Sequence, residues 1–142
     1  MIAKKLAMCA AGLVIGAMCA VGTPAPAHAT TIGNDMIALV NQYRVSLGLH
    51  PVKKDPSIQG EATEWANTMA HGDRYEHSSK NLYEIIFNPG LDVPDSDLAP
   101  YSVNAWRNSP SHNRIMLEEN ITRVGADCAK GKKANYCIMN FM

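Results

Sequence analysis

The sequence predicts an α+β domain that follows an N-terminal export signal. Apolar residues recur at the helical period in residues 34–47 and 56–72, and again over a shorter stretch at 97–107. Near the end of the chain the period changes to two, first in residues 124–128 and then in residues 137–141. Such alternation in two neighbouring short segments is typical of a β-hairpin. Helices combined with a small sheet give the α+β class.

The first 29 residues have the pattern of a secretory signal. Lys4 and Lys5 give it a positive start, and a mostly apolar run extends from Leu6 to Val21. A cleavage site of the A-x-A type follows at Ala27-His28-Ala29. Because no charged stop follows the apolar run, we do not expect a permanent membrane-spanning helix.

A lipoprotein anchor at Cys19 is the alternative for this segment. The bulky Met18 beside that cysteine matches such an anchor poorly, so we expect cleavage before Thr30. The chain then has two parts, a signal peptide at residues 1–29 and a single secreted, extracellular domain at residues 30–142.

Charge and composition exclude several classes of partner. The chain has 13 Lys and Arg residues against 13 Asp and Glu residues. Since Lys4 and Lys5 leave with the signal, the remaining domain has a slight acidic excess. It has no basic surface interleaved with aromatic residues, so we expect no nucleic-acid partner. We also expect no attraction to anionic membranes and no stable membrane insertion, and we predict a monomer.

The two long helical segments have clear start and stop signals. Asn34 or Asp35 can cap the first helix, and Gly48 supplies the left-handed residue that ends it. Asp55 can cap the second helix, which Gly72-Asp73 closes. The apolar stripes are Ile37, Val40, Tyr43, Arg44 and Leu47 in the first helix and Ile58, Ala62, Trp65, Ala66 and Met69 in the second.

Two further elements and a loop are predicted in the middle of the chain. Residues 84–87 form a short apolar run that predicts a strand, and residues 88–97 are rich in Pro, Gly and Asp, which predicts a surface loop. A third helix runs from about Asp97 to Arg107. We expect Pro100 to be accepted there because it lies in the first turn.

Two cysteines remain after signal cleavage, Cys128 and Cys137. An even pair in an exported chain indicates a disulfide, and two buried free thiols are the alternative. If the two residues face each other, the strands form a hairpin with its turn at residues 131–134, and one face carries six apolar side chains. The predicted pairs are Cys128 with Cys137, Ala126 with Met139 and Val124 with Phe141.

Several short segments spanning residues 34–141 occur in an order and spacing that resemble a small bacterial member of the CAP superfamily, also called SCP-like extracellular domains. That family includes cysteine-rich secretory proteins, insect venom antigen 5 and plant pathogenesis-related proteins. The matching segments are Asn41-Gln42-Tyr43-Arg44, Gly48-Leu49, Ala66 to Ala70 before His77-Ser78, Ala105-Trp106, Ser109-Pro110-Ser111-His112 and Ile138-Met139-Asn140-Phe141.

The resemblance implies a three-layer α/β/α sandwich, in which a small antiparallel sheet lies between helical layers. It also implies a central cleft lined by two histidines and by acidic residues. His77 and His112 match the two histidines. Glu84 takes the place of the acid in the family's Gly-Glu-Asn motif.

Two departures from the family pattern reduce this site. The Gly-Glu-Asn motif is here Tyr83-Glu84-Ile85, so both neighbours of the acid differ. Many eukaryotic members have another glutamate three residues after the helix tryptophan, whereas the residue at that distance from Trp106 is Ser109. The usual group of two histidines and two acids is reduced to His77, His112 and Glu84.

Two neutral imidazoles can share a divalent cation, and zinc suits nitrogen ligands. Some family members bind a divalent ion through these histidines, so the resemblance implies a weak, open metal site at His77 and His112. Glu84 would be a third ligand or would orient a ligand from the second coordination shell. The alternative is that both imidazoles only form hydrogen bonds with the backbone and with Glu84.

Nucleophilic catalysis has less support. Ser78 and Ser79 lie near a histidine in the sequence, but a triad needs nucleophile, base and orienting acid within hydrogen-bond reach. The sequence also contains no strained G-x-S-x-G turn. Ser109 and Ser111 are better explained as caps of a fourth, short helix that extends to Leu117.

Five other residues are predicted to be structural. Trp65 and Trp106 lie on the apolar faces of helices, and Trp106 is also a candidate for the cleft floor. Tyr43 and Arg44 are expected to anchor the first helix to its neighbours. His71, at the end of the second helix, can bond terminal carbonyl groups.

The favoured prediction is a binding module whose cleft recognises an extracellular small molecule, lipid or peptide, with a weakly held divalent cation. One alternative is a metal-dependent hydrolase or peptidase, in which His77 and His112 position a water and Glu84 is the base. Another is a cell-surface interaction protein with a vestigial cleft. Enzyme activity is therefore left open, with non-catalytic binding favoured.

Overall fold

The structure is a computed structural model that describes residues 27–142, with side chains from Thr31 onward. Most of the predicted signal peptide at residues 1–29, and the alternative anchor at Cys19, lie outside the described residues. Ala27-His28-Ala29, the predicted cleavage site, are the first residues of a helix.

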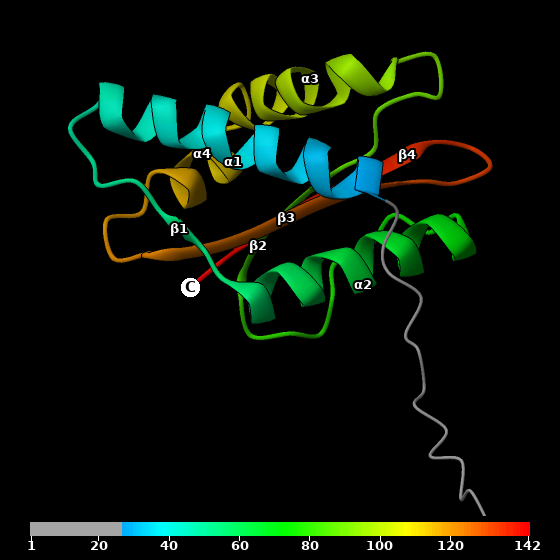
Figure 1. The fold of residues 1–142 in the computed structure, drawn as a ribbon, viewed down its shortest axis with the longest axis horizontal. Coiled ribbons are helices and arrows are strands. Elements are labelled where there is room, and N and C mark those ends of the chain that lie inside the picture. Colours follow the sequence, from blue (N-terminus) through cyan, green and yellow to red (C-terminus); the bar gives the residue numbers. More distant parts are fainter. Residues whose placement is uncertain (1–26) are drawn as a thin grey trace, which may run out of the picture.

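Three layers make up the fold (Figure 1). Helices α1 (Ala27–Ser46), α3 (Asp95–Arg107) and α4 (Pro110–Met116) lie on one side of a four-stranded sheet, and α2 (Pro56–Gly72) covers the other side. This arrangement confirms the α+β class and the three-layer sandwich. The strands have the order β1-β3-β4-β2, and β1 to β4 are Lys53–Lys54, Tyr83–Phe87, Arg123–Lys130 and Asn135–Phe141.

The sheet is mixed and not wholly antiparallel. β2 and β3 both pair with β4 in antiparallel orientation, whereas β1 pairs with β3 in parallel. Nothing in the sequence predicts β1, because two lysines carry no apolar pattern. The strand forms because β3 and the residue before it supply acceptors: Lys53 N–H donates to Thr122 O and Asp55 N–H donates to Val124 O, both at 2.9 Å.

The hairpin of β3 and β4 has the predicted register, and its two cysteines form the predicted disulfide. Gly131 N–H donates to Ala134 O at 2.9 Å and closes the turn. Six buried side chains lie on the face toward α1 and α3, as expected from the alternation. They form the pairs Val124 with Phe141, Ala126 with Met139 and Cys128 with Cys137.

Each face of the sheet has its own apolar core. Ile85 belongs to the larger core, which packs against α1 and α3, while its neighbour Ile86 belongs to the smaller core under α2. The buried Gln59 side chain also joins α2 to β3: its Nε2 donates to Ala126 O at 2.8 Å and its Oε1 accepts from Ala126 N–H at 3.2 Å. The sheet is therefore held from both sides.

The predicted caps of α2 are confirmed, but the predicted start of α1 is wrong. Asp55 accepts from Ser57 N–H at 2.9 Å and from Ile58 N–H at 3.1 Å. Helix α1 begins at Ala27 and not at Asn34 or Asp35. Its early turns bury Ile32 in the larger core, so tertiary packing extends the helix past the local cap signal.

The third and fourth helices also differ in detail from the prediction. Because α3 begins at Asp95, Pro100 lies in the second turn and not in the first. Pro100 is exposed, so water can reach the carbonyl that lacks its usual N–H partner. Ser109 occupies the N-cap position of α4 but its side chain makes no cap bond, and Ser111 lies inside the helix.

Candidate functional site

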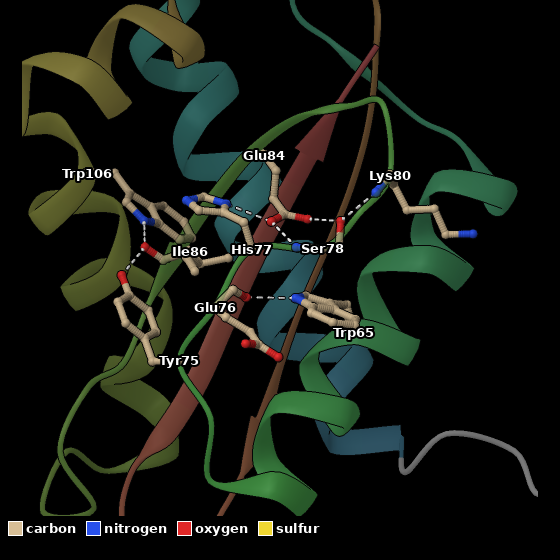
Figure 2. Close-up of polar contacts among 9 residues, drawn as sticks. All are labelled: Trp65, Tyr75, Glu76, His77, Ser78, Lys80, Glu84, Ile86 and Trp106. Carbon is tan, nitrogen blue, oxygen red and sulfur yellow. Dashed lines mark hydrogen bonds and ion pairs between the residues drawn. The ribbon is translucent and has the colours of Figure 1, made fainter.

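The segment between α2 and β2 is held in place by three aromatic side chains (Figure 2). Trp65 Nε1–H donates to Glu76 O at 2.9 Å, and Tyr75 O–H donates to Ile86 O at 2.9 Å. Trp106, which is fully buried, donates its Nε1–H to the same Ile86 oxygen at 3.1 Å. These bonds fix the backbone on both sides of the segment that carries the first histidine.

Glu84 lies on β2 and accepts hydrogen bonds at both of its carboxylate oxygens. Its Oε1 accepts from His77 Nδ1 at 2.7 Å and from Ser78 N–H at 2.9 Å. Its Oε2 accepts from Ser78 Oγ at 2.5 Å. The Glu84 side chain is only 6% exposed, whereas that of His77 is 58% exposed. The carboxylate is therefore an internal anchor, and the imidazole is the group presented to solvent.

The bond to Glu84 also fixes the tautomer of His77. A carboxylate oxygen accepts, so Nδ1 carries the proton and donates, which leaves the Nε2 lone pair of a neutral imidazole free. This is the arrangement in which a carboxylate orients a metal-ligating histidine from behind.

His112 lies in the first turn of α4, a helix that contacts β2. Burial lowers the pKa of His112 below its ordinary value, and the charge that His77 can carry lowers this pKa further. His112 therefore stays neutral to lower pH than an ordinary histidine.

The order of these groups differs from that of a catalytic triad. In a triad the histidine lies between the nucleophile and the carboxylate, and it accepts the proton of the nucleophile. Here Glu84 lies between Ser78 and His77, because Ser78 Oγ donates to the carboxylate. Ser109 Oγ and Ser111 Oγ are 3.4 Å from each other. Over residues 31–142, no serine hydroxyl forms a hydrogen bond with an imidazole.

The donor set decides which metal site is feasible. No group of three or more His, Cys, Asp or Glu side chains within the described part of the chain could hold a metal ion. Both oxygens of Glu84 already accept protein hydrogen bonds. Of the predicted ligands, His77 and His112 therefore remain as candidate nitrogen donors, while Glu84 is engaged by hydrogen bonds from His77 and Ser78.

His71, near the end of α2, has the predicted structural role. His71 Nδ1 donates to Asn67 O at 2.8 Å, one turn earlier in α2.

The sequence did not reveal that Ser78 donates twice to Glu84, because a serine next to a histidine predicts a nucleophile as readily as an anchor. Its only sequence signal was its position six residues before an acid on a strand.

A pocket lies beside Ser78, on the side of α2. Its volume is about 210 Å³. The residues that line it are Glu61, Glu64, Trp65, Ser78, Ser79 and Lys80.

Comparison with known proteins gives one family and a consistent fold. The model of the CAP, or cysteine-rich secretory protein, family matches residues 37–141. Comparison with the curated protein sequences finds none that matches this chain.

Among solved structures, an outer surface protein from Borrelia burgdorferi is 19% identical with a TM-score of 0.62, over 76% of this chain and 91% of that one. An extracellular protein containing an SCP domain from Bacillus anthracis is 18% identical with a TM-score of 0.64, over 80% of this chain and 41% of that one. NaASP2, solved with Zn²⁺, is 12% identical with a TM-score of 0.65, over 84% of this chain and 81% of that one. At these identities the likeness shows the fold alone.

Proposed function

The chain belongs to the CAP family of cysteine-rich secretory proteins, and from that premise we propose that it is a secreted binding module whose His77–His112 pair holds a divalent cation weakly. The cation and the surface around it take part in binding an extracellular ligand. The A-x-A-type site at the N-terminus and the disulfide between Cys128 and Cys137 support export.

One observation carries this proposal: Glu84 fixes His77 by its Nδ1 and leaves Nε2 free. His112 adds a second imidazole, whose lowered pKa favours the neutral, metal-binding form at physiological pH. Two nitrogen donors suit zinc, and with only two protein ligands the affinity is expected to be low. NaASP2 was solved with Zn²⁺, which makes zinc the first cation to test.

The same geometry favours binding over hydrolysis. A general base must be free to accept a proton from water or substrate. Glu84 is almost completely buried and already accepts from three donors, so it is poorly placed to act as that base. A bound cation would supply positive charge and open coordination positions for an oxygen atom of the ligand. The role of the chain's own residues is to hold and orient the two imidazoles.

Isothermal titration of the 30–142 domain with zinc tests the proposal. We expect one weak site per chain that is lost in His77→Ala and in His112→Ala. In Glu84→Gln we expect affinity to fall by about 10–100-fold, because the residue that orients His77 is altered. Glu119→Gln, a change at an exposed acid, is the matched control and should leave the titration unchanged.

Three outcomes would contradict the proposal. Absence of heat at millimolar zinc removes the metal from it, and heat that persists in both histidine variants places the site elsewhere. If a natural partner still binds when both histidines are replaced, the protein is better described as a surface interaction protein with a vestigial cleft.

A further inference from the structure

The pocket beside Ser78, here called the Trp65 pocket, adjoins the histidine pair without being lined by either histidine. Figure 2 shows Trp65 and Lys80 on the α2 side of Ser78, with His77 on the side of Trp106. Ser78 is therefore the shared wall: its hydroxyl is bonded to Glu84, and its residue also lines the pocket. A ligand in this pocket would lie within reach of the surface around His77.

Trp65 gives the pocket a fixed aromatic wall. The indole is half-buried, packs against the smaller core, and donates its Nε1–H to Glu76 O at 2.9 Å. Its polar atom is thus satisfied inside the protein, and the ring keeps one orientation. An aromatic surface that is ordered before binding loses little conformational entropy when a ligand packs against it.

The charges around the pocket have both signs. Glu61 and Glu64 lie one turn apart on α2, and Lys80 belongs to the loop that follows Ser78. Within the described residues these three charged groups form no hydrogen bond or ion pair through their side chains. The two glutamates would repel an anionic ligand, and Lys80 would oppose their attraction for a cationic one.

The same charges also disfavour a purely apolar ligand. Such a group would cover the two carboxylates and the ammonium and remove their water without replacing its hydrogen bonds. A neutral group with many hydroxyls avoids this cost, because each hydroxyl both donates and accepts. It can donate to Glu61 and Glu64 and accept from Lys80, while Ser79 offers a further hydroxyl.

The volume of the Trp65 pocket also limits the size of the ligand. Sites for drug-sized ligands have volumes of about 300–1,000 Å³, so a pocket of about 210 Å³ takes a single ring and not an extended chain. A sugar ring combines a rim of hydroxyls with apolar C–H faces that can pack on an indole. We propose that the Trp65 pocket binds one pyranose ring of an extracellular glycan, as a subsite beside the histidine pair.

The two tryptophans of the chain provide the test. In a proton–nitrogen correlation spectrum, Trp65 and Trp106 each give one indole N–H signal. Titration with tetra-N-acetylchitotetraose, and separately with cellotetraose, should shift the Trp65 signal saturably for at least one of the two probes. The Trp106 signal should move much less, because that side chain is fully buried and donates to Ile86 O.

Variants locate the binding surface. Trp65→Ala should weaken glycan binding by about tenfold or more, because stacking on the indole is lost. Since Trp65 also packs against the core, the double variant E61Q/E64Q provides a second test that leaves the core untouched. We expect it to weaken binding several-fold, and Glu119→Gln, on an exposed turn outside the pocket, to leave binding unchanged.

The outcomes separate this inference from the proposed metal site. If neither oligosaccharide shifts the Trp65 signal at millimolar concentration, the glycan subsite is wrong, whatever zinc does. Glycan binding as strong as that of the wild-type protein in both E61Q/E64Q and Trp65→Ala also overturns it. So does a shift of the Trp65 signal by a nucleoside such as adenosine when both glycans give none. Loss of zinc binding with glycan binding retained would overturn the metal site alone.

Discussion

At the scale of single residues, the candidate site combines a buried carboxylate, Glu84, with an exposed imidazole, His77. The Glu84 side chain is 6% exposed and accepts hydrogen bonds from His77 and Ser78, whereas the His77 side chain is 58% exposed and faces solvent. His112, half-buried in α4, is the third member. Because Glu84 fixes the protonated nitrogen of His77, the site is organised before any ligand arrives.

The coupling between the two histidines can be measured directly. Burial and the charge on His77 both lower the pKa of His112, so its titration midpoint should lie below the ordinary histidine value of 6.5. In His77→Gln the charge is removed, and the His112 midpoint should rise toward that value. A proton NMR titration of the imidazole signals gives the His112 midpoint in the wild-type protein and in His77→Gln.

The same lowered pKa has a consequence for stability. The folded protein binds fewer protons at His112 than the unfolded chain does, so this residue lowers stability as the pH falls through the ordinary histidine range. An unchanged His112 midpoint in His77→Gln would show that the two imidazoles do not interact.

At the scale of elements, the close approach of α2 to the sheet depends on a glycine. A Cβ at Gly125 on β3 would overlap the backbone of Ile58 and Gln59 at the start of α2. The absent side chain lets Gln59 reach the backbone of Ala126. Gly60, in the same helix, has open space around it and is exposed.

These two glycines make a matched pair for a stability measurement. Gly125→Ala should lower the free energy of unfolding by about 2–3 kcal/mol, because α2 must move away from β3. Gly60→Ala should raise it by about 0.5–1 kcal/mol, because alanine favours a helix interior and loses less chain entropy. Urea denaturation of both variants checks the signs, and equal effects would show that α2 does not pack closely on β3.

At the scale of the whole molecule, Arg44 joins three parts that are far apart in the sequence. It is fully buried in α1, yet its guanidinium donates only to carbonyl oxygens. Its Nε–H donates to His50 O at 2.9 Å, and its Nη1 donates to Met116 O at 2.7 Å and to Glu118 O at 3.0 Å. The predicted anchoring role of Arg44 is confirmed, and the residue ties α1 to the end of α4, the helix that carries His112.

Replacement of Arg44 should therefore affect both stability and the site. Arg44→Met fills similar volume but leaves three carbonyl groups without their donor, and we expect a loss on the order of 3 kcal/mol in the free energy of unfolding. Arg114→Met, at an exposed position of α4, should change stability little. Denaturation curves give the free energy of unfolding of the two variants. A similar loss of stability in both would contradict the anchoring role of Arg44.

The monomeric state and the identity of the extracellular ligand remain predictions at this scale. Light scattering of the 30–142 domain should give the mass of one chain. None of the helices between residues 27 and 142 has the length and the apolar content that a membrane span requires.

Much of the fold could be predicted because its signals are local. The cap at Asp55, the left-handed Gly48 with a φ of 81°, and the strand at residues 84–87 each depend on a few neighbouring residues. The prediction was wrong at Leu47. This residue was expected on the apolar stripe of the first helix, but it lies beyond the end of α1 at Ser46 and is 54% exposed.

The fold class, the order of the main elements and the register of the closing hairpin could all be predicted from the sequence, since the hydrophobic period and one cysteine pair leave a single consistent pairing of the two strands. It also singled out His77, His112 and Glu84. How these three side chains are arranged depends on contacts between residues that are far apart in the sequence. The positions of Ser78, Trp65 and Trp106 around them depend on contacts between α2, β2 and α3, and no local pattern records such contacts. These contacts make Glu84 a buried hydrogen-bond acceptor that orients His77.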